Sequence, residues 1–467
     1  MKKILLCLLL LALTALFFFL GHRKSVRLPS PNEELSGIFE QASRNPALSG
    51  ASIGFCLLDA QGEVVFERQS RTSFIPASTL KTLTTATALE KWGPDYRIKT
   101  TLLATAAIKE GVIEGDVIIQ GGADPMLSLQ DLESWARTLH NQGLKKITGR
   151  ILGDGRLFKG SIYNDFWDWG DLGNGYGSGV SGLNLEHNRY IAHFRPGSAV
   201  GAIAMFLGAT PEVPNVQWIN EVTTGTADSG DGVVIHGGES THLLHLRGTV
   251  PLAARDFQVR GAVPDPESYV AHHLRQVLIN AGISVEGAAI SMKQLLNDEE
   301  PPISADEVLL THTSPPLLEI ITSIHATSDN HETECLYRLL GFEANLSSDE
   351  VLREHWRQRG LVFEGLRMED GCGLARADFI RPLDLARLQN AVGRGPQGTL
   401  YRDSLLSANE GHLRWKGGAM SGVRSYTGFI NGKSGAQFTF ALMANHFSNT
   451  GEISALRDAV LQNLQER

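Results

Sequence analysis

A serine and a lysine three residues apart, Ser78 and Lys81, are the first side chains in the sequence that could do chemistry together. On a helix, positions i and i+3 share a face, so the lysine amine can reach the serine hydroxyl. A partly desolvated lysine has a lowered pKa and can accept the proton of a hydroxyl nucleophile. The pair therefore indicates nucleophilic catalysis, on a helix predicted from Pro76 to a stop at Gly93.

This S-x-x-K pattern is weak by itself, because a chain this long should contain about one match by chance. An ordinary N-cap serine beside a surface lysine would look the same. Its position favours chemistry. It is the only such match in the sequence, and it directly follows residues 51–69, which are predicted to form two strands joined at Ala60-Gln61-Gly62.

A second candidate pair is a serine followed two residues later by an asparagine. The first two matches precede Ser78 in regions without other site residues, and the last is typical of a polar turn. The third lies between two helical segments, where a tight loop can direct a hydroxyl and an amide into a cleft. We therefore choose Ser328 and Asn330 among the four matches, Ser30-Pro-Asn32, Ser43-Arg-Asn45, Ser328-Asp-Asn330 and Ser407-Ala-Asn409.

A third candidate is a lysine in a Lys-x-Gly triad, of which three were weighed. Lys109 falls in the β-rich middle of the chain and is set aside. Asn431-Gly432 is a strong hairpin signal, so turn chemistry explains Lys433 just after it. Lys416 lies on the preceding predicted strand. Two further predicted strands and a helix follow it in the sequence. We therefore choose Lys416.

The elements that must position these residues fall into two patterns. Helices are predicted at residues 33–43 and 452–465, with further helices from about residue 305 and strands again near the end of the chain. Residues 96–303 differ, because they are rich in glycine and short β-like runs, with one clear helix at 267–281. A part built of helices and strands is thus split by a mainly β insertion.

Length and charge narrow the class of protein. With 467 residues the chain should form two or three domains. The net charge of -9 argues against a nucleic-acid partner. The three cysteines beyond Cys7 do not form a disulfide scaffold, and the sequence contains no CxxC, no HExxH and no convincing metal-ligand cluster.

The N-terminus is expected to direct export. A basic start precedes an apolar run, residues 4–20, which then meets the basic segment GHRKSVR. This pattern is typical of a cleaved signal peptide or of an uncleaved membrane anchor, and both remain open. In either case the body of the protein is predicted to be periplasmic or in the cell envelope, with possible membrane association through its N-terminus.

The order of these motifs resembles the class C low-molecular-mass penicillin-binding proteins, which are bacterial D-alanyl-D-alanine carboxypeptidases and endopeptidases. The likeness spans most of the chain, in order. Its further signatures are QGGADPMLS from Gln120, FWDWGDLGNGYG from Phe166, SGLNLEHN from Ser181, DGCGLAR from Asp370 and GAMSGVRSYTGFI from Gly418.

The resemblance implies an α/β fold of the α+β type: a transpeptidase- and β-lactamase-like domain with a five-stranded antiparallel sheet flanked by helices, plus an inserted mainly β region. A compact β-lactamase would not need so long an insertion. The expected parts are a signal or anchor at 1–28, a catalytic domain from 29–95 and 305–467, an insertion subdomain from 96–183 and 267–304, and an inner β subdomain at 184–266.

The resemblance also implies a mechanism without metal or organic cofactor. Ser78 attacks the carbonyl of a D-Ala-D-Ala bond or of a D,D cross-link in peptidoglycan stem peptides, and Lys81 takes its proton. Ser328 relays a proton to the leaving amine, while Asn330 positions Lys81 and the substrate amide. Lys416 supplies positive charge for the substrate carboxylate. β-Lactams would mimic the dipeptide and trap the acyl-enzyme.

Substrate-binding roles are implied for three further residues. Gly418 and Ala419 would line the substrate strand, and the backbone N–H groups of Ser78 and Ala419 would form the oxyanion hole. Asp171 could meet a free amine on the stem peptide. A turn or capping role for Asp171 explains it equally well.

Two residues depart from the family pattern. Gly417 stands where Thr or Ser is usual, and one lost charge-assisted hydrogen bond costs about 1.5–3 kcal/mol. Cys372 stands where the family has a serine, and is expected to be a small buried residue rather than a reactive thiol. A non-catalytic or weakly active wall-binding protein on the same scaffold is therefore the alternative, and a structural β-rich protein with chance motifs is a third, more remote interpretation.

Overall fold

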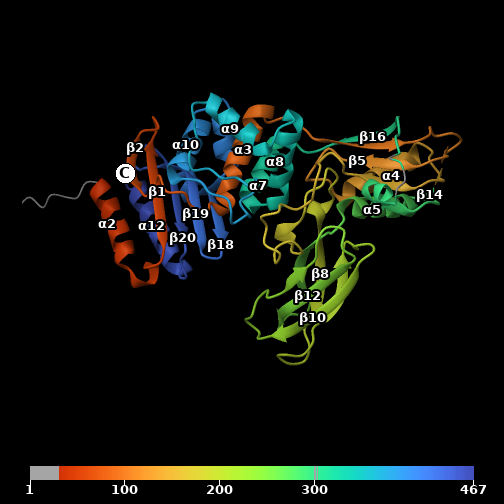
Figure 1. Cartoon of the computed structure of the whole chain (residues 1–467), viewed down its shortest axis with the longest axis horizontal. Coiled ribbons are helices and arrows are strands. Elements are labelled where there is room, and N and C mark those ends of the chain that lie inside the picture. Colours follow the sequence, from red (N-terminus) through yellow and green to blue (C-terminus); the bar gives the residue numbers. More distant parts are fainter. Residues whose placement is uncertain (1–30, 299–300, 302) are drawn as a thin grey trace, which may run out of the picture.

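The computed structural model describes residues 31–298, 301 and 303–467. Figure 1 shows a helix-flanked sheet at one end, built from the two ends of the chain, and the inserted region at the other. The apolar run at residues 4–20 lies outside the described residues. Among the residues described, none of the helices combines the length and the apolar character needed to cross a membrane.

An antiparallel sheet of six strands forms the centre of the first part, in the order β17-β18-β19-β20-β1-β2. Five strands were expected. The sixth is the three-residue edge strand β17, which falls in a segment whose Ser-Ala-Asn sequence reads as a polar turn. The bounds are β1 Ser52–Asp59, β2 Val64–Arg68, β17 Leu406–Ala408, β18 Leu413–Met420, β19 Val423–Asn431 and β20 Gln437–Asn445.

Both faces of this sheet are covered by helices. On β1, Phe55 and Leu57 pack with the first and last helices, whereas Cys56 and Leu58 point to the opposite face. Alternate side chains of a strand point to opposite faces, which explains why this interior strand is apolar almost throughout. The predicted α+β class, with a helix-flanked antiparallel sheet, is confirmed. The flanking helices are α2 Pro31–Arg44, α3 Lys81–Trp92, α7 Leu317–Thr327, α8 Asn330–Ala344, α9 Ser348–Gln358, α10 Pro382–Gly393, α11 Gly398–Ser404 and α12 Thr450–Gln465.

The helix predicted from Pro76 begins differently from the expectation. A 3₁₀ turn, η2 Ala77–Leu80, precedes α3, and the helix ends at Gly93 as expected. Ala77 has a φ of 47°, in the left-handed region, so the chain bends sharply just before Ser78. Ser78 therefore lies on the 3₁₀ turn and Lys81 is the first residue of α3.

The insertion contains more helix than the sequence indicated. Its five-stranded mixed sheet runs β15-β7-β5-β3-β16, beside a small sheet β14-β6-β4. Three helices accompany them, and α5 was the only one predicted. The missed α4 begins with a capping box between Ser128 and Asp131, a signal that the sequence does carry. The bounds are β3 Lys99–Ala104, β4 Val112–Ile113, β5 Val117–Gln120, α4 Leu129–Asn141, β6 Lys146–Ile147, β7 Ile151–Asp154, α5 Pro266–Asn280, β14 Ser284–Val285, β15 Ala289–Ser291, α6 Met292–Asn297 and β16 Glu307–Thr313.

The inner segment forms two three-stranded sheets, β10-β12-β11 and β13-β8-β9. The division of the chain into domains stays a prediction. Strand β16 pairs with β3, however, so residues 307–313 belong to the sheet of the insertion although the proposed boundary at 305 groups them with the catalytic part. The inner strands are β8 Arg189–Arg195, β9 Met205–Thr210, β10 Gln217–Gly225, β11 Val234–His236, β12 Leu243–Pro251 and β13 Phe257–Ala262.

Candidate active site

The amine of Lys81 is the centre of the candidate site. It donates to Ser78 Oγ at 3.1 Å, to Asn330 Oδ1 at 2.5 Å and to the carbonyl oxygen of Cys372 at 2.6 Å. Lys81 is fully buried, whereas Ser78 is half-buried. A lysine held by three oxygen atoms, one of them a serine hydroxyl, is positioned to exchange a proton with that hydroxyl.

A second lysine–serine pair lies beside the first. Lys416 Nζ donates to Ser328 Oγ and to the carbonyl oxygen of Gly417, both at 2.8 Å. Burial, and then the nearby charge of Lys81, lower the pKa of Lys416 to about 7. At neutral pH, Lys416 can therefore either give or accept a proton.

Ser328 lies in the turn between α7 and α8, and Asn330 is the first residue of α8. Ser328 ends α7 with a φ of 61°, a left-handed conformation that is uncommon outside glycine. The side-chain amide of Asn330 is bonded at both ends: its oxygen accepts from Lys81, and its nitrogen donates to the carbonyl oxygen of Tyr176 at 2.8 Å. These two bonds orient the amide between the catalytic part and the insertion.

Strand β18 approaches the nucleophile closely. A Cβ atom on Gly418 would lie 2.7 Å from Ser78 N and 2.8 Å from the carbonyl oxygen of Pro76, so only glycine fits there. The next residue, Ala419, is exposed. The structure places Lys416 against Ser328, whereas Lys433 is exposed in the turn between β19 and β20 and pairs with Glu466 at 2.6 Å.

Asp171 reaches the site only indirectly. Its Oδ1 accepts from the hydroxyl of Tyr176 at 2.9 Å, and the backbone carbonyl of Tyr176 accepts from Asn330. Burial raises the pKa of Asp171, although the Tyr176 hydrogen bond opposes that effect. Tyr176 thus links Asp171 of the insertion to Asn330.

The carbonyl of Cys372 is held in place by Asp370. The buried Asp370 carboxylate accepts from the indole of Trp167 at 2.8 Å and from four successive backbone N–H groups, those of residues 372–375. Burial raises the pKa of the Cys372 thiol well above its usual value, so the thiol stays protonated inside the protein. These properties support the interpretation of Cys372 as a packing residue.

Some residues of the site were not recognised in the sequence as candidates. Tyr176 adjoins the Trp-x-Trp-x-Asp signature, and its glycine-flanked position, Gly-Tyr-Gly, was a usable signal. Glu334 is buried, and its Oε1 accepts from Gly371 N at 2.5 Å. Burial and the charge of Asp370 raise the pKa of Glu334 to about 8. Nothing in the local sequence distinguishes Glu334 from a surface glutamate of α8.

Comparison with known proteins shows the family. The profile of the D-Ala-D-Ala carboxypeptidase 3 (S13) family matches residues 35–466. The chain therefore belongs to that family, and the predicted class of enzyme, a serine-type D-Ala-D-Ala peptidase, is confirmed.

Its relatives resemble it over nearly their whole length. A D-alanyl-D-alanine carboxypeptidase of Actinomadura sp. (strain R39) is 26% identical over 96% of this chain and 86% of the relative. D-alanyl-D-alanine carboxypeptidase DacB of Haemophilus influenzae is 23% identical over 87% and 88%. The crystal structure of penicillin-binding protein 4 from H. influenzae has a TM-score of 0.80 at 19% identity, covering 93% of this chain and 99% of that one, and so shows the fold.

Proposed function

We propose that this chain cleaves the D-Ala-D-Ala bond of peptidoglycan stem peptides, or a D,D cross-link between two stems, through an acyl-enzyme on Ser78. The observation that carries the proposal is the pair of adjacent lysine–serine contacts. Lys81 bonds Ser78 and Asn330, and Lys416 bonds Ser328. Nucleophile, base and proton donor are thereby assembled from three distant segments of the chain.

Acylation begins at Ser78. As its Oγ attacks the scissile carbonyl, the proton passes to Lys81, which Asn330 and the Cys372 carbonyl hold in place. The developing oxyanion is stabilised by the backbone N–H groups of Ser78 and Ala419. The close approach of β18 to the nucleophile at Gly418 is consistent with this arrangement.

Protonation of the leaving amine depends on the second lysine–serine pair, Lys416 and Ser328. Ser328 gives its proton to the leaving D-alanine nitrogen and is reprotonated by Lys416, whose pKa of about 7 suits a proton donor at neutral pH. Lys416 also supplies positive charge for the terminal carboxylate of the substrate. Water then hydrolyses the ester on Ser78. A β-lactam presents an amide and a carboxylate of similar arrangement and would acylate the same serine.

The insertion would select the stem peptide. The Asp171 carboxylate, bonded to the Tyr176 hydroxyl, supplies a negative charge near the catalytic loop, and a free amine on the stem is the chemical group that matches it. We place this work outside the cytoplasm, in the periplasm or cell envelope. That placement, and any membrane association, depends on the basic and apolar N-terminal sequence.

Turnover of defined muropeptides tests the proposal. The parent should release free D-alanine from pentapeptide stems, or convert D,D-cross-linked dimers into monomers, and chromatography separates these products. Lys81→Met should lower the turnover rate by about 10²–10⁴-fold, the usual worth of a positioned base. Lys433→Met is the matched control, because that lysine is exposed and lies on the hairpin away from Ser328. Equal turnover by the parent and Lys81→Met would contradict the proposal, and no turnover by the parent would favour a wall-binding role without catalysis.

A further inference from the structure

Ser328, Asp329 and Asn330 form a short segment that we call the catalytic loop, and its middle residue, Asp329, is bound by the insertion. Its carboxylate accepts from both terminal nitrogens of Arg189, at 2.5 and 3.1 Å, in a two-pronged ion pair. It also caps α8 by accepting from Glu332 N at 3.0 Å. Burial acts to raise the pKa of Asp329, but the charge and hydrogen bonds of Arg189, the charge of His187 and the backbone N–H of Glu332 together outweigh it, and the pKa lies well below its usual value. Asp329 is therefore a buried anion whose charge is balanced by the insertion.

Arg189 also holds the segment that contacts Asn330. Its Nε donates to the carbonyl oxygen of Gly175 at 2.5 Å, and the next residue, Tyr176, accepts from Asn330 Nδ2 through its backbone carbonyl. These contacts form a closed ring. Arg189 bonds both Asp329 and Gly175, Tyr176 bonds Asn330, and the two remaining links are the peptide bonds between residues 175 and 176 and between residues 329 and 330. Both side chains of the loop that face the insertion are thus fixed by one small group of residues.

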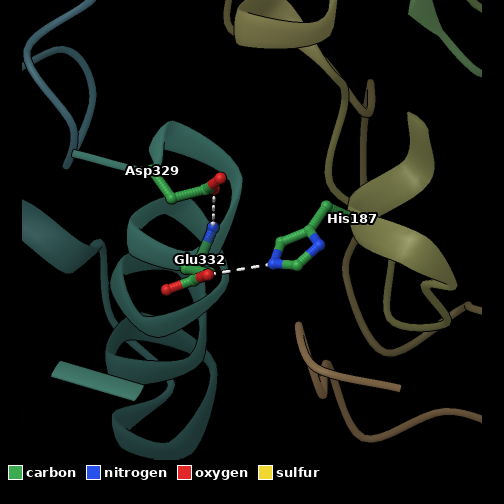
Figure 2. Close-up of side chains that lie close together, drawn as sticks. All are labelled: His187, Asp329 and Glu332. Atoms are coloured by element: carbon green, nitrogen blue, oxygen red, sulfur yellow. Dashed lines mark hydrogen bonds and ion pairs between the residues drawn. The ribbon is translucent and has the colours of Figure 1, made fainter. Parts of the chain in front are cut away.

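A second ion pair lies one turn along α8. His187 Nε2 lies 2.9 Å from Glu332 Oε1, and Ser323 of α7 donates to the same oxygen at 2.9 Å. Figure 2 shows His187 reaching from the insertion toward α8, with Glu332 on that helix and Asp329 at its start. Burial acts to lower the pKa of His187, but the hydrogen bond to Glu332 and the charges of Asp329 and Glu332 together outweigh it and raise the pKa.

We infer that Arg189 is a positioning residue for the proposed reaction: through Asp329 and Gly175 it holds Ser328 and Asn330 at their distances from the two catalytic lysines. The need for such support is visible in Ser328, whose left-handed backbone must be held by its surroundings. Charged groups that bond in two prongs fix geometry more strictly than single contacts do. The inference rests on the proposed function, and adds to it that the insertion completes the catalytic loop as well as facing the substrate.

Acylation kinetics of the full chain, purified in mild detergent, test this inference. A fluorescent penicillin gives the acylation rate constant, the concentration dependence of that rate and the labelled fraction at completion. Arg189→Met should lower the acylation rate constant by about 10- to 100-fold, since small displacements of catalytic groups cost this much. The labelled fraction at completion and the apparent binding constant should change little. Asp329→Asn should give a similar loss, and the double variant should lose little more, because both changes break one contact.

Arg338→Met is the matched control. Arg338 is another arginine that joins α8 to the insertion, by donating to the carbonyl oxygens of Ser161, Ile162 and Val180, but it does not bond the catalytic loop. This variant should melt at a lower temperature and acylate at the parental rate.

Each other outcome is also decisive. Parental rate constants in Arg189→Met, or a loss seen only as a smaller labelled fraction, would overturn the inference and leave Arg189 a purely structural residue. If Arg189→Met does not fold, Asp329→Asn alone decides by the same criteria. Absence of labelling in the parent would instead overturn the proposed penicillin-sensitive acyl-enzyme, and this inference with it.

Discussion

At the residue scale, Gly417 separates this site from the family pattern most clearly. It lies between Lys416 and Gly418 on β18, at the position where the family resemblance implies a threonine or serine whose hydroxyl would hold the carboxylate of a substrate or penicillin. A Cβ atom placed there would lie 3.3 Å from the ring of Trp415 and 3.8 Å from that of Tyr426. The position is tight but can be filled if the Trp415 ring moves by a few tenths of an ångström.

Gly417→Thr should therefore raise the second-order rate of penicillin acylation. One charge-assisted hydrogen bond is worth about 1.5–3 kcal/mol, or roughly ten- to a hundredfold. Gly417→Val is the control of matched shape, because it adds the same branched side chain without a hydroxyl, and it should not accelerate acylation. Stopped-flow measurement of all three proteins would show this. An equal gain in both variants would mean that strand geometry, and not the hydroxyl, limits the rate.

The lowered pKa of Lys416 predicts how the free energy of unfolding changes with pH. Its pKa is lowered from 10.5 to about 7 in the folded protein, so between these values the unfolded chain binds a proton that the folded chain does not. The contribution of this group to stability therefore rises with pH across that window, and the full cost of the buried ammonium is present below pH 7. Lys416→Met removes the cost and should be more stable than the parent by about 1–4 kcal/mol at pH 6. Urea unfolding at pH 6 and pH 9 should show the gap narrowing at the higher pH, and a gap that is constant or widens would contradict the assignment.

At the element scale, the turn of residues 370–375 fixes the position of the Cys372 carbonyl oxygen, which accepts a hydrogen bond from Lys81. Asp370→Asn leaves one acceptor oxygen among five donors, so the turn should loosen and the Cys372 carbonyl should shift. We expect a loss of about 3–5 kcal/mol in the free energy of unfolding, as for a broken buried charge network, together with slower acylation. Denaturant unfolding measures the first quantity.

Asp378→Asn provides the comparison for that turn. Burial and the charge of Asp370 raise the pKa of Asp378 well above its usual value, so replacing its carboxyl by an amide of similar shape should remove less negative charge than the same change at Asp370. This variant should unfold at nearly the parental denaturant concentration. If both variants unfold at the same concentration, the charge of Asp370 does not stabilise the turn.

Several helices and strands could be predicted from the sequence, and others could not, for different physical reasons. Helix α5 and the strands after residue 412 follow their apolar periodicity. The 3₁₀ turn at Ser78 was not predicted because it depends on the left-handed backbone of Ala77, and no sequence signal indicates that conformation at an alanine. Strand β17 is three residues long and is stabilised by pairing with β18 alone. Helix α4 was missed although its capping box was readable.

At the scale of the whole molecule, the order of motifs along the chain was enough to predict the family and the fold, because each motif carries its own local signal. The residues proposed for catalysis come from η2, the first residues of α3 and α8, the turn between α7 and α8, and β18. Hydrogen bonds join them in two sets, Lys81 with Ser78 and Asn330, and Lys416 with Ser328. Their supporting residues could not be predicted in this way. Arg189 and Asp329, for example, lie 140 positions apart and show their relation only in the folded chain.

The most direct test of the central claim is covalent labelling of the full chain by a fluorescent penicillin, beside Ser78→Ala. The account predicts a labelled band in the parent that withstands denaturation and is absent from Ser78→Ala, since the acyl group is carried by that one hydroxyl. A band of equal strength in Ser78→Ala, or no band in the parent, would contradict an acyl-enzyme on Ser78.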